Sequence, residues 1–334
     1  MRVGVVGCGL MGRRRALYAR SSGDSIALVA DLDGRRAEAL AAEVGGRAVD
    51  DWSTAATSEE VEAVVVATFS AAAYHVAAAA LDAGKHVFCE KPLGVDAGEA
   101  RELVDAAHAS GTVLETGFTL RHHPAIERAH ELVTEGVLGT PLWLRAAYGH
   151  GGRAGYADEW RARRELSGGG ELLDQGVHLV DLSRWFLGPV AQVAGVVGTF
   201  AWDVPVEDNA FAILRHGSGA VSALHASWTQ WRNLFRIELH GTAGYVVVEG
   251  LGGSYGDERL EVAVRTDPGE PPVSEVSTYA DSDAPWRREW AAFSRRVAAG
   301  DAGDGAGAGY HAALVVDAVY AASASGRFEA VCAP

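Results

Sequence analysis

The chain of 334 residues carries 44 acidic and 29 basic side chains, a formal net charge of −15, and 48% of its residues are hydrophobic. This length favours two domains, and the negative charge disfavours nucleic acid and anionic membrane surfaces as partners. No apolar run reaches the roughly eighteen residues of a membrane span, and three scattered cysteines without metal-type spacing argue against disulfides and a metal site, so we expect a cytoplasmic protein with reduced thiols.

The first third of the chain alternates short apolar strands with helices. Strands are predicted at 3–6, 25–30, 63–67, 86–89 and 112–117, and helices at 10–21, 35–44, 72–83 and 97–109. Strands that are apolar throughout are buried on both faces, as in a parallel sheet covered by helices on each side. Residues 1–121 are therefore expected to form an α/β domain with a doubly wound parallel sheet.

The pattern changes after residue 121. Helices are predicted at 124–135, 171–186, 286–299 and 310–323, a strand at 142–148, and successive strands with glycine-containing turns over 190–265. The segments 149–170 and 266–285 lack such a pattern, and the Gly/Ala/Asp-rich stretch 301–309 is expected to be a flexible loop. Residues 122–334 are therefore predicted to form an α+β domain with a mostly antiparallel open sheet, with the option that its last helix packs back on the first domain.

A glycine-rich turn joins the first predicted strand to the first helix. Gly7, Gly9 and Gly12 form the pattern G-x-G-x-x-G in VGVVGCGLMG. In a dinucleotide-binding Rossmann domain these glycines allow a tight turn, the approach of the pyrophosphate to the backbone, and close packing of helix on strand. The position between strand and helix favours this function over a chance match among 41 glycines, and Leu10 and Met11 are included in the predicted cofactor site.

The second strand ends at Asp31, nineteen residues after Gly12. A carboxylate there can accept hydrogen bonds from the adenosine ribose hydroxyls and repels a 2′-phosphate, which favours NAD over NADP. Two alternatives stay open. Asp31 could serve only as a turn-and-cap residue beside Asp33, or Arg35 and Arg36 could accommodate the phosphate of NADP.

Glu90, Lys91 and Pro92 follow the predicted strand 86–89. They therefore lie at the carboxyl edge of the parallel sheet, where open α/β sheets bind their ligands. Lys91 can donate a hydrogen bond to a substrate hydroxyl, and Glu90 can position it. The alternative is an exposed ion pair at the end of a strand.

A second group of polar side chains lies in SGGGELLDQGVHLVDL. On a helix, the spacing of Asp174, His178 and Asp181 places all three on one face. A neutral imidazole can accept a proton from a substrate hydroxyl while a carboxylate one turn away orients it. Gly176 leaves room for a substrate or another backbone segment. The alternative is an ion pair on a helix surface.

Together these segments resemble the Gfo/Idh/MocA family of oxidoreductases. The similar stretches are GCGLMG, DAGKHVFCEKP, GFTLRHHPA and GGGELLDQGVHLVDL, in the family's order, with AVYAASASGRFEAV near the end of the chain. The resemblance implies a Rossmann domain followed by a domain for substrate binding and oligomerisation. It also implies hydride transfer between a nicotinamide cofactor and an alcohol or ketone carbon of a sugar, a sugar derivative or a cyclitol such as inositol.

The resemblance assigns the chemistry to three positions. Lys91 matches the lysine that hydrogen-bonds the reacting oxygen, and His178 matches the proton acceptor. Asp174 matches the partner of that histidine or a substrate-binding carboxylate. Glu90 and Lys91 are also included in the expected cofactor site.

Further contacts are implied around the cofactor and the substrate. Thr68 and His75 lie in a segment that resembles the one passing the cofactor riboses, although Phe69 stands where the family usually has Pro or Asn. Arg121 matches an arginine that often reaches the substrate or nicotinamide region, and a surface charge before a proline is its alternative.

The arginine-rich segment 149–170 contributes the remaining predicted substrate contacts, Trp160 and Arg153. Trp160 and Arg161 resemble a pair that can close over the cofactor. Arg153, Arg161, Arg163 and Arg164 could bind a phosphorylated or carboxylated substrate, or could form a charged lid that faces solvent.

Several functions compete with a dehydrogenase. On the same fold, the chain could be a ketoreductase of sugar-nucleotide or antibiotic-sugar biosynthesis, or a glycosidase that uses NAD transiently. A non-enzymatic NAD-binding regulator is disfavoured because Lys91 and His178 are both present. A metal-dependent hydrolase using His122, His123 and Asp174 is the remaining alternative. The exact substrate and the direction of reaction stay open.

Large aromatic residues are frequent in the predicted β-rich region. Phe200, Trp202, Trp228 and Trp231 exceed what one sheet face packed on helices would need. A homodimer or homotetramer that associates through this sheet is therefore expected.

Overall fold

The computed structural model describes residues 1–153, 155–265, 272–301 and 305–332. The chain divides into two compact units. Unit 1 comprises Met1–Phe118, Glu165–Gly168 and Trp286–Ala313, and unit 2 comprises Thr119–Arg164, Gly169–Pro285 and Leu314–Pro334. The first change of unit lies close to the expected boundary at residue 121. The expected second domain, 122–334, differs from this division because residues 286–313 cluster with unit 1.

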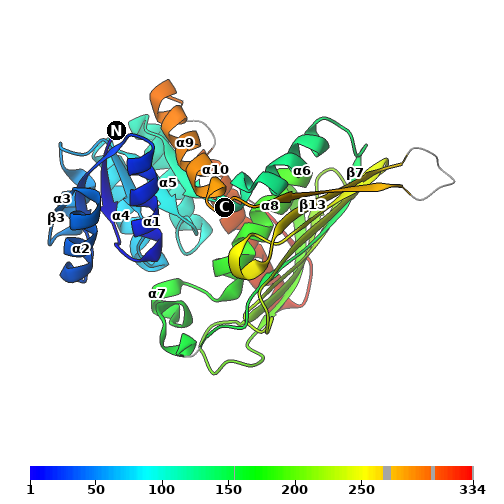
Figure 1. The fold of residues 1–334 in the computed structure, drawn as a ribbon. Coiled ribbons are helices and arrows are strands. Elements are labelled where there is room, and N and C mark those ends of the chain that lie inside the picture. The colour runs from blue at the N-terminus through cyan, green and yellow to red at the C-terminus, as the bar shows by residue number, and fades with distance from the viewer. Residues whose placement is uncertain (154, 266–271, 302–304, 333–334) are drawn as a thin grey trace. The chain divides into compact units, whose positions relative to one another are not determined.

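Unit 1 is built on a six-stranded parallel sheet (Figure 1). Its strands are β1 (Arg2–Val6), β2 (Ser25–Ala30), β3 (Arg47–Ala48), β4 (Ala63–Val66), β5 (His86–Glu90) and β6 (Leu114–Gly117). Their spatial order, β3-β2-β1-β4-β5-β6, is that of a Rossmann domain, in which ligands bind outside the carboxyl ends of the strands near β1 and β4. The predicted parallel sheet is therefore confirmed.

Five helices connect these strands. They are α1 (Leu10–Ser21), α2 (Gly34–Val44), α3 (Trp52–Thr57), α4 (Ser70–Asp82) and α5 (Ala97–Ser110). The sequence predicted the bounds of α1 and β2 as they are found, because apolar runs and glycine turns mark both. It missed β3 and α3, because two strand residues and a six-residue helix leave no measurable period.

A helix from late in the sequence completes the core of unit 1. In α9 (Ala284–Ala299), Trp290 and Phe293 are buried in the same cluster as Phe88 of β5. Trp290 Nε1 also donates a hydrogen bond to Asp24 Oδ2 at 2.8 Å. The helix was predicted at nearly the observed bounds, but in the second domain. A helical period reveals an apolar face without revealing which sheet that face covers.

Unit 2 contains a nine-stranded sheet in the order β14-β13-β12-β11-β7-β10-β9-β8-β15. The strands are β7 (Pro141–Gly149), β8 (Val190–Gly198), β9 (Asn209–His216), β10 (Val221–Ser227), β11 (Leu234–Gly241), β12 (Gly244–Glu249), β13 (Glu258–Val264), β14 (Ser274–Tyr279) and β15 (Glu329–Ala330). Only the β7–β10 pair is parallel, so the predicted mostly antiparallel sheet is confirmed.

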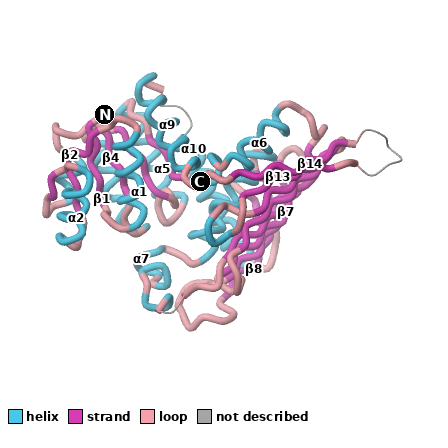
Figure 2. The backbone as a smooth tube through the Cα atoms, viewed as in Figure 1, coloured by secondary structure: helices cyan, strands magenta, loops and turns pink. Residues whose placement is uncertain are grey.

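Helices lie against one face of this sheet. The helix α6 (Pro124–Thr134) packs on β12 to β14, and α8 (Val177–Leu187) packs on β7 and β10 (Figures 1 and 2). On the other face, which we call the open face, Trp143, Phe211 and Ile213 are exposed. The sheet therefore has one packed and one exposed side, as antiparallel sheets commonly do.

The aromatic residues expected on this sheet do not all face outward. Trp228 is fully buried in a cluster with Tyr156 and Val206, and Trp202 packs against that cluster. Only Phe200 and Trp231 of the predicted set are exposed. The expectation that four aromatic residues contribute an association surface is wrong for Trp202 and Trp228, because they form a local core.

Three segments without a predicted helix or strand contain regular structure, and the first of them, 149–170, includes the short helix α7 (Arg164–Ser167). Within the expected excursion 266–285, residues 266–271 lie outside the described residues, and β14 pairs with β13. Within the expected loop 301–309, residues 302–304 lie outside the described residues, and α10 (Gly305–Ser325) already begins at Gly305. Although α10 is 21 residues long, no helix within the described ranges is apolar enough to cross a membrane.

Candidate functional site

The glycine loop between β1 and α1 has the geometry that its three glycines require. At Gly7, φ is +92° and a Cβ atom would lie 2.4 Å from a carbonyl oxygen after β4. At Gly12, a Cβ atom would lie 1.7 Å from the Gly7 carbonyl oxygen, whereas at Gly9 it would meet no heavy atom within 4 Å. Gly9 therefore opens onto free space at the N-terminus of α1, where Leu10 is exposed. A pyrophosphate fits such a space because backbone N–H groups point into it.

Asp31 is held beside the same loop. Its Oδ2 accepts a hydrogen bond from the Cys8 N–H at 2.6 Å, and its Oδ1 accepts one from the Asp33 N–H at 2.9 Å. The cap of α2 is Asp33, whose carboxylate accepts the Arg35 N–H at 3.1 Å and pairs with Arg36. The carboxylate of Asp31 is thus kept at the glycine loop, where a cofactor ribose would be bound.

Cys8 lies between the first two glycines of the loop, and no function was predicted for it. Burial and the charge of Asp31 raise the pKa of the Cys8 thiol to about 12. Burial and the charge of Glu90 likewise raise the pKa of Cys89 to about 12. Both thiols stay protonated near neutral pH and are poor nucleophiles.

The loop before α4 holds Thr68 and Phe69. Thr68 Oγ1 donates a hydrogen bond to the Phe69 carbonyl oxygen at 3.2 Å, and Phe69 is extended with φ −69° and ψ 153°. A phenylalanine is compatible with this backbone, so the departure from the family's usual residue does not distort the start of α4. His75 is exposed farther along α4, with its ring 5.2 Å from that of Tyr74.

Glu90 and Lys91 lie at the carboxyl end of β5, as predicted. Lys91 is half-buried there. Glu90 Oε1 accepts a hydrogen bond from Arg15 Nε of α1 at 2.7 Å. Glu90 is thus bound by a protein side chain, and its contribution to a cofactor site stays a prediction.

In unit 2, Asp174 and His178 lie on either side of a change in helix type. Residues Leu172–Gly176 form a π-helical turn, η4, and α8 follows from Val177. The expected single α-helix over 171–186 is therefore wrong in its first part. The glycine before this turn allows a close backbone contact: at Gly170 a Cβ atom would lie 2.0 Å from the Glu207 carbonyl oxygen. Such π-turns occur frequently at functional sites.

The residues of this turn and of the start of α8 contact the sheet and the segment before the turn. His178 is buried, with its ring centroid 6.2 Å from that of Tyr148. At Gly176 a Cβ atom would lie 3.4 Å from the Ala226 Cβ of β10, so this glycine lets the helix approach the sheet. Asp174 Oδ2 accepts a hydrogen bond from Arg161 Nε at 3.1 Å. Arg161 therefore compensates the charge of Asp174.

Arg121 and Asp181 hold each other. Arg121 Nε donates to Asp181 Oδ2 at 2.7 Å, Nη2 bonds the other oxygen, and the guanidinium lies 5.3 Å from the Trp185 ring centroid. Burial raises the pKa of Asp181, and Arg121 opposes that rise. Arg121 is thus part of a partly buried ion pair rather than a free surface charge. Asp181 points to Arg121, so it is not a third member of an Asp174–His178 group.

The arginines of segment 149–170 contact groups of unit 2. Arg153 Nη2 donates to Glu159 Oε2 at 2.7 Å, and Arg161 stacks on Trp160 at 4.6 Å from its ring centroid. The other two donate to backbone carbonyl oxygens, Arg163 to Asp158 at 3.1 Å and Arg164 to Pro205 at 3.2 Å.

Residues that the sequence analysis missed surround Asp174 and His178. Tyr148 hydrogen-bonds Tyr255, which also bonds Gln175 of the π-helical turn. Burial, with Tyr255 and Asp174, raises the pKa of Tyr148 well above its ordinary value, so its hydroxyl stays protonated. Burial lowers the pKa of His150 at the end of β7, and the charge of Asp174 opposes this. The one available signal was the Tyr-Gly-His sequence at the end of strand 141–149.

His123, one of the histidines proposed for a metal-dependent hydrolase, contacts a carboxylate of the unit 2 sheet. His123 is buried, and its Nδ1 lies 2.8 Å from Glu258 Oε2. Glu258 also accepts the Ala125 N–H at 2.6 Å. His123 and Glu258 thus join α6 to β13. In the part of the chain that the structure describes, no three His, Cys, Asp or Glu side chains are grouped as metal ligands.

Two family models match the chain. The model of the oxidoreductase family with an NAD-binding Rossmann fold matches residues 1–118, and that of the GFO/IDH/MocA C-terminal domain matches residues 126–247.

Individual proteins also match. A 1,5-anhydro-D-fructose reductase of Ensifer adhaerens is 32% identical over 253 residues, which are 74% of this chain and 75% of that protein. The structure of GenD2 from gentamicin A biosynthesis in complex with NAD matches with a TM-score of 0.86 at 28% identity, over 100% of this chain and 97% of that one. Levoglucosan dehydrogenase in complex with NADH has the same fold, with a TM-score of 0.90 at 23% identity over 100% of both chains.

Proposed function

Because this chain belongs to the Gfo/Idh/MocA family of oxidoreductases, we propose that it transfers hydride between NAD(H) and a secondary alcohol or ketone carbon of a sugar, a sugar derivative or a cyclitol. The observation that carries this proposal is the glycine loop between β1 and α1. This loop leaves free space at Gly9, and its Cys8 N–H binds the Asp31 carboxylate. A pyrophosphate fits the free space at Gly9, and a ribose can bind the Asp31 carboxylate. The enzyme is expected to act in the cytoplasm with reduced thiols.

The catalytic roles follow from the chemistry of the side chains. The bound nicotinamide would supply the site that accepts or donates hydride. Lys91 donates a hydrogen bond to the substrate oxygen and stabilises its developing negative charge, and His178 accepts the hydroxyl proton as the carbonyl forms. Asp174, held by Arg161, orients His178 or binds a neighbouring substrate hydroxyl. Lys91 belongs to unit 1 and His178 to unit 2.

The contacts of the arginine-rich segment favour an uncharged substrate. Arg153 and Arg161 pair with carboxylates, and Arg163 and Arg164 bond carbonyl oxygens. A phosphorylated substrate would have to displace these partners. A free sugar, anhydrosugar or cyclitol would instead bind through neutral groups such as the Tyr148 and Tyr255 hydroxyls.

The similarity to GenD2 supports a second candidate, an oxidoreductase acting on an antibiotic sugar. A single screen separates the candidates. The enzyme is incubated with NAD and with inositols, free aldoses, anhydrosugars, aminoglycoside sugars or sugar nucleotides, and NADH is followed by absorbance. Reduction of NAD by an uncharged polyol or sugar is the expected result. Bond cleavage without net NADH would indicate a glycosidase, and no turnover of any class would contradict the proposal.

Asp31 is expected to determine the choice between NAD and NADP. We expect a higher kcat/KM with NAD than with NADP, because the Asp31 carboxylate, which is held at the glycine loop, would repel the 2′-phosphate of NADP. Asp31→Ala should weaken NAD binding and narrow the difference between the two cofactors. Steady-state kinetics with both cofactors provide the measurement. A clear preference of the unaltered enzyme for NADP would show that Arg35 and Arg36, and not Asp31, control the choice.

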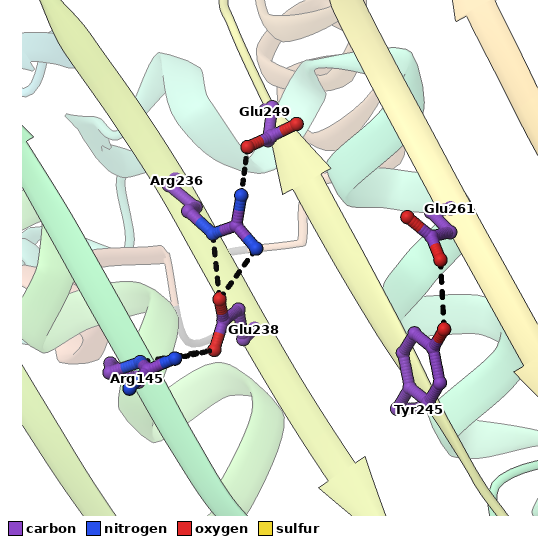
Figure 3. Close-up of polar contacts among 6 residues, drawn as sticks. All are labelled: Arg145, Arg236, Glu238, Tyr245, Glu249 and Glu261. Carbon is purple, nitrogen blue, oxygen red and sulfur yellow. Dashed lines mark hydrogen bonds and ion pairs between the residues drawn. The ribbon is translucent and has the colours of Figure 1, made fainter.

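We also propose that two or more copies associate through the open face of the unit 2 sheet. Rings stack across its strands: Trp143 on His240 and Phe211 on His225, each with centroids 4.1 Å apart. Beside them, Arg145 and Arg236 both bond Glu238, and Arg236 also bonds Glu249 (Figure 3). Two arginines balance two glutamates, so this part of the face carries little net charge although the whole chain is at −15. A locally neutral face with exposed aromatic rings suits a second copy.

Replacing Phe211 by arginine is expected to reduce the assembly to monomers, because a charge would replace an exposed ring on the open face. Light scattering at micromolar concentration measures the mass. Trp52→Arg is the matched control, since Trp52 is a similarly exposed aromatic residue of α3 in unit 1, and it should leave the mass unchanged. A monomeric unaltered protein under the same conditions would rule out this assembly.

A further inference from the structure

Among the residues that the structure describes, Arg15 of α1 is the only arginine whose side chain is fully buried. Its Nε donates to Glu90 Oε1 at 2.7 Å, and its Nη1 donates to Glu289 Oε2 of α9 at 2.5 Å. The guanidinium also lies 4.4 Å from the Phe88 ring centroid and 4.8 Å from that of Trp286. Coulomb attraction from the two glutamates raises the pKa of Arg15 against the opposing effect of burial, so it stays charged. A charge is costly to bury, and these partners compensate it.

The neighbouring strand leaves room for this arrangement. At Gly117 of β6, a Cβ atom would lie 3.1 Å from Glu90 Oε2 and 3.2 Å from Arg15 Nη2. Gly117 is paired with Glu90 in the sheet. A larger residue at this position would therefore press on the ion pair, which means that the end of β6 is shaped around the Arg15–Glu90 contact.

The contact lies next to Lys91 in the chain. The ladder between β5 and β6 ends at Glu90, one residue before Lys91. On the far side of Lys91, Leu93 is buried, and a Cβ atom on Gly309 of α10 would lie 2.8 Å from it. The backbone of Lys91 is thus held from both sides: Arg15 binds the residue before it, and α10 confines the residue two positions after it.

We infer that Arg15 is a positioning residue, which acts by holding the Glu90 carboxylate and thereby fixes the direction in which Lys91 presents its ammonium group. The inference rests on the proposed function only in assigning Lys91 to the substrate oxygen. Because catalysis by a hydrogen-bond donor depends on its placement within fractions of an ångström, loosening this support lowers turnover more than cofactor binding.

A second arginine provides a matched control. Arg296 of α9 bonds Glu115 of β6, so it also joins α9 to the sheet of unit 1, through a carboxylate other than Glu90. Arg15→Met and Arg296→Met should both lower the melting temperature. Only Arg15→Met should disturb Lys91. Glu90→Met is the companion variant, because it leaves Arg15 paired with Glu289 and so avoids an uncompensated buried charge.

The composition of the chain allows a direct observation of Lys91. Lys85 and Lys91 are the only two lysines in the sequence. Reductive methylation with ¹³C-formaldehyde therefore gives one signal from each lysine and one from the N-terminus in a carbon–proton NMR spectrum. In Arg15→Met and Glu90→Met, the Lys91 methyl signal should shift and broaden while the Lys85 signal stays in place. In Arg296→Met, both signals should match those of the unaltered protein.

Kinetics on the unmethylated variants complete the test. Arg15→Met and Glu90→Met should lower kcat by roughly tenfold or more, with a smaller change in KM and in NADH affinity. An unchanged Lys91 signal in folded Glu90→Met, or an equal disturbance in Arg296→Met, would overturn the inference. The NMR result does not require a known substrate, so a failure of the proposed function would leave the positioning of Lys91 independently tested.

Discussion

His178→Ala is expected to lower turnover by roughly 10²-fold or more, while NADH affinity changes little. For hydride to leave a secondary alcohol, the hydroxyl proton must be accepted as the carbonyl forms, and a base has to lie within hydrogen-bond reach of that oxygen. His178 is buried next to Tyr148, whose raised pKa keeps its hydroxyl protonated and so unavailable to accept a proton near neutral pH. The imidazole is therefore the group of this cluster best suited to accept the proton. Stopped-flow and steady-state kinetics measure the effect.

Lys91→Ala should lower turnover by a similar factor, roughly 10²-fold, because the charge that develops on the oxygen would lose its hydrogen-bond donor.

His216→Ala is the matched control for His178→Ala. His216 is another buried histidine of unit 2, bonded to Ser183 and Ser222, and its loss should reduce stability without reducing turnover. Near-normal turnover in His178→Ala would remove this mechanism. So would a structure with NADH in which the ring lies more than about 8 Å from the Lys91 ammonium, without domain closure.

The parts of the fold that the sequence predicted are those specified by local patterns. The strand 25–30 and the helix 10–21 coincide with β2 and α1, because an apolar run and a glycine turn define each locally. The pairing of β14 with β13 depends on a partner strand, and nothing in the sequence Ser274–Tyr279 reveals that partner. The same reason explains why α9 was predicted as a helix but its packing in the core of unit 1 was not.

The candidate site divides in the same way. Gly7, Gly9 and Gly12 could be found because their function is carried by the backbone of one short loop. The partners of Asp174 and Arg121 could not, since each carboxylate or guanidinium can pair with any opposite charge that the fold brings near. Asp174 pairs with Arg161, 13 residues away in sequence, and Arg121 pairs with Asp181, 60 residues away.

The second large effect is expected from substitutions in the glycine loop between β1 and α1. Gly12→Ala and Gly9→Ala should impair the protein in different ways. Gly12→Ala would place a Cβ atom 1.7 Å from the Gly7 carbonyl oxygen, so α1 must move away from β1. This variant should melt at a clearly lower temperature and lose NADH binding. Gly9→Ala meets no atom within 4 Å and has an ordinary φ of −70°, so its melting temperature should not change.

NADH affinity of Gly9→Ala should nevertheless fall by roughly tenfold or more, about 1.4 kcal/mol, because the added methyl group occupies the space proposed for the pyrophosphate. Thermal melts and NADH titrations by fluorescence separate the two losses. Gly217→Ala is the control: its Cβ atom would meet only a carbonyl oxygen at 3.9 Å, far from any cofactor loop in sequence, and neither measurement should change. If Gly9→Ala binds NADH as tightly as the unaltered protein, the pyrophosphate does not lie at this loop. A loss of stability in Gly9→Ala equal to that in Gly12→Ala would show instead that Gly9 serves the packing of α1 and not the cofactor.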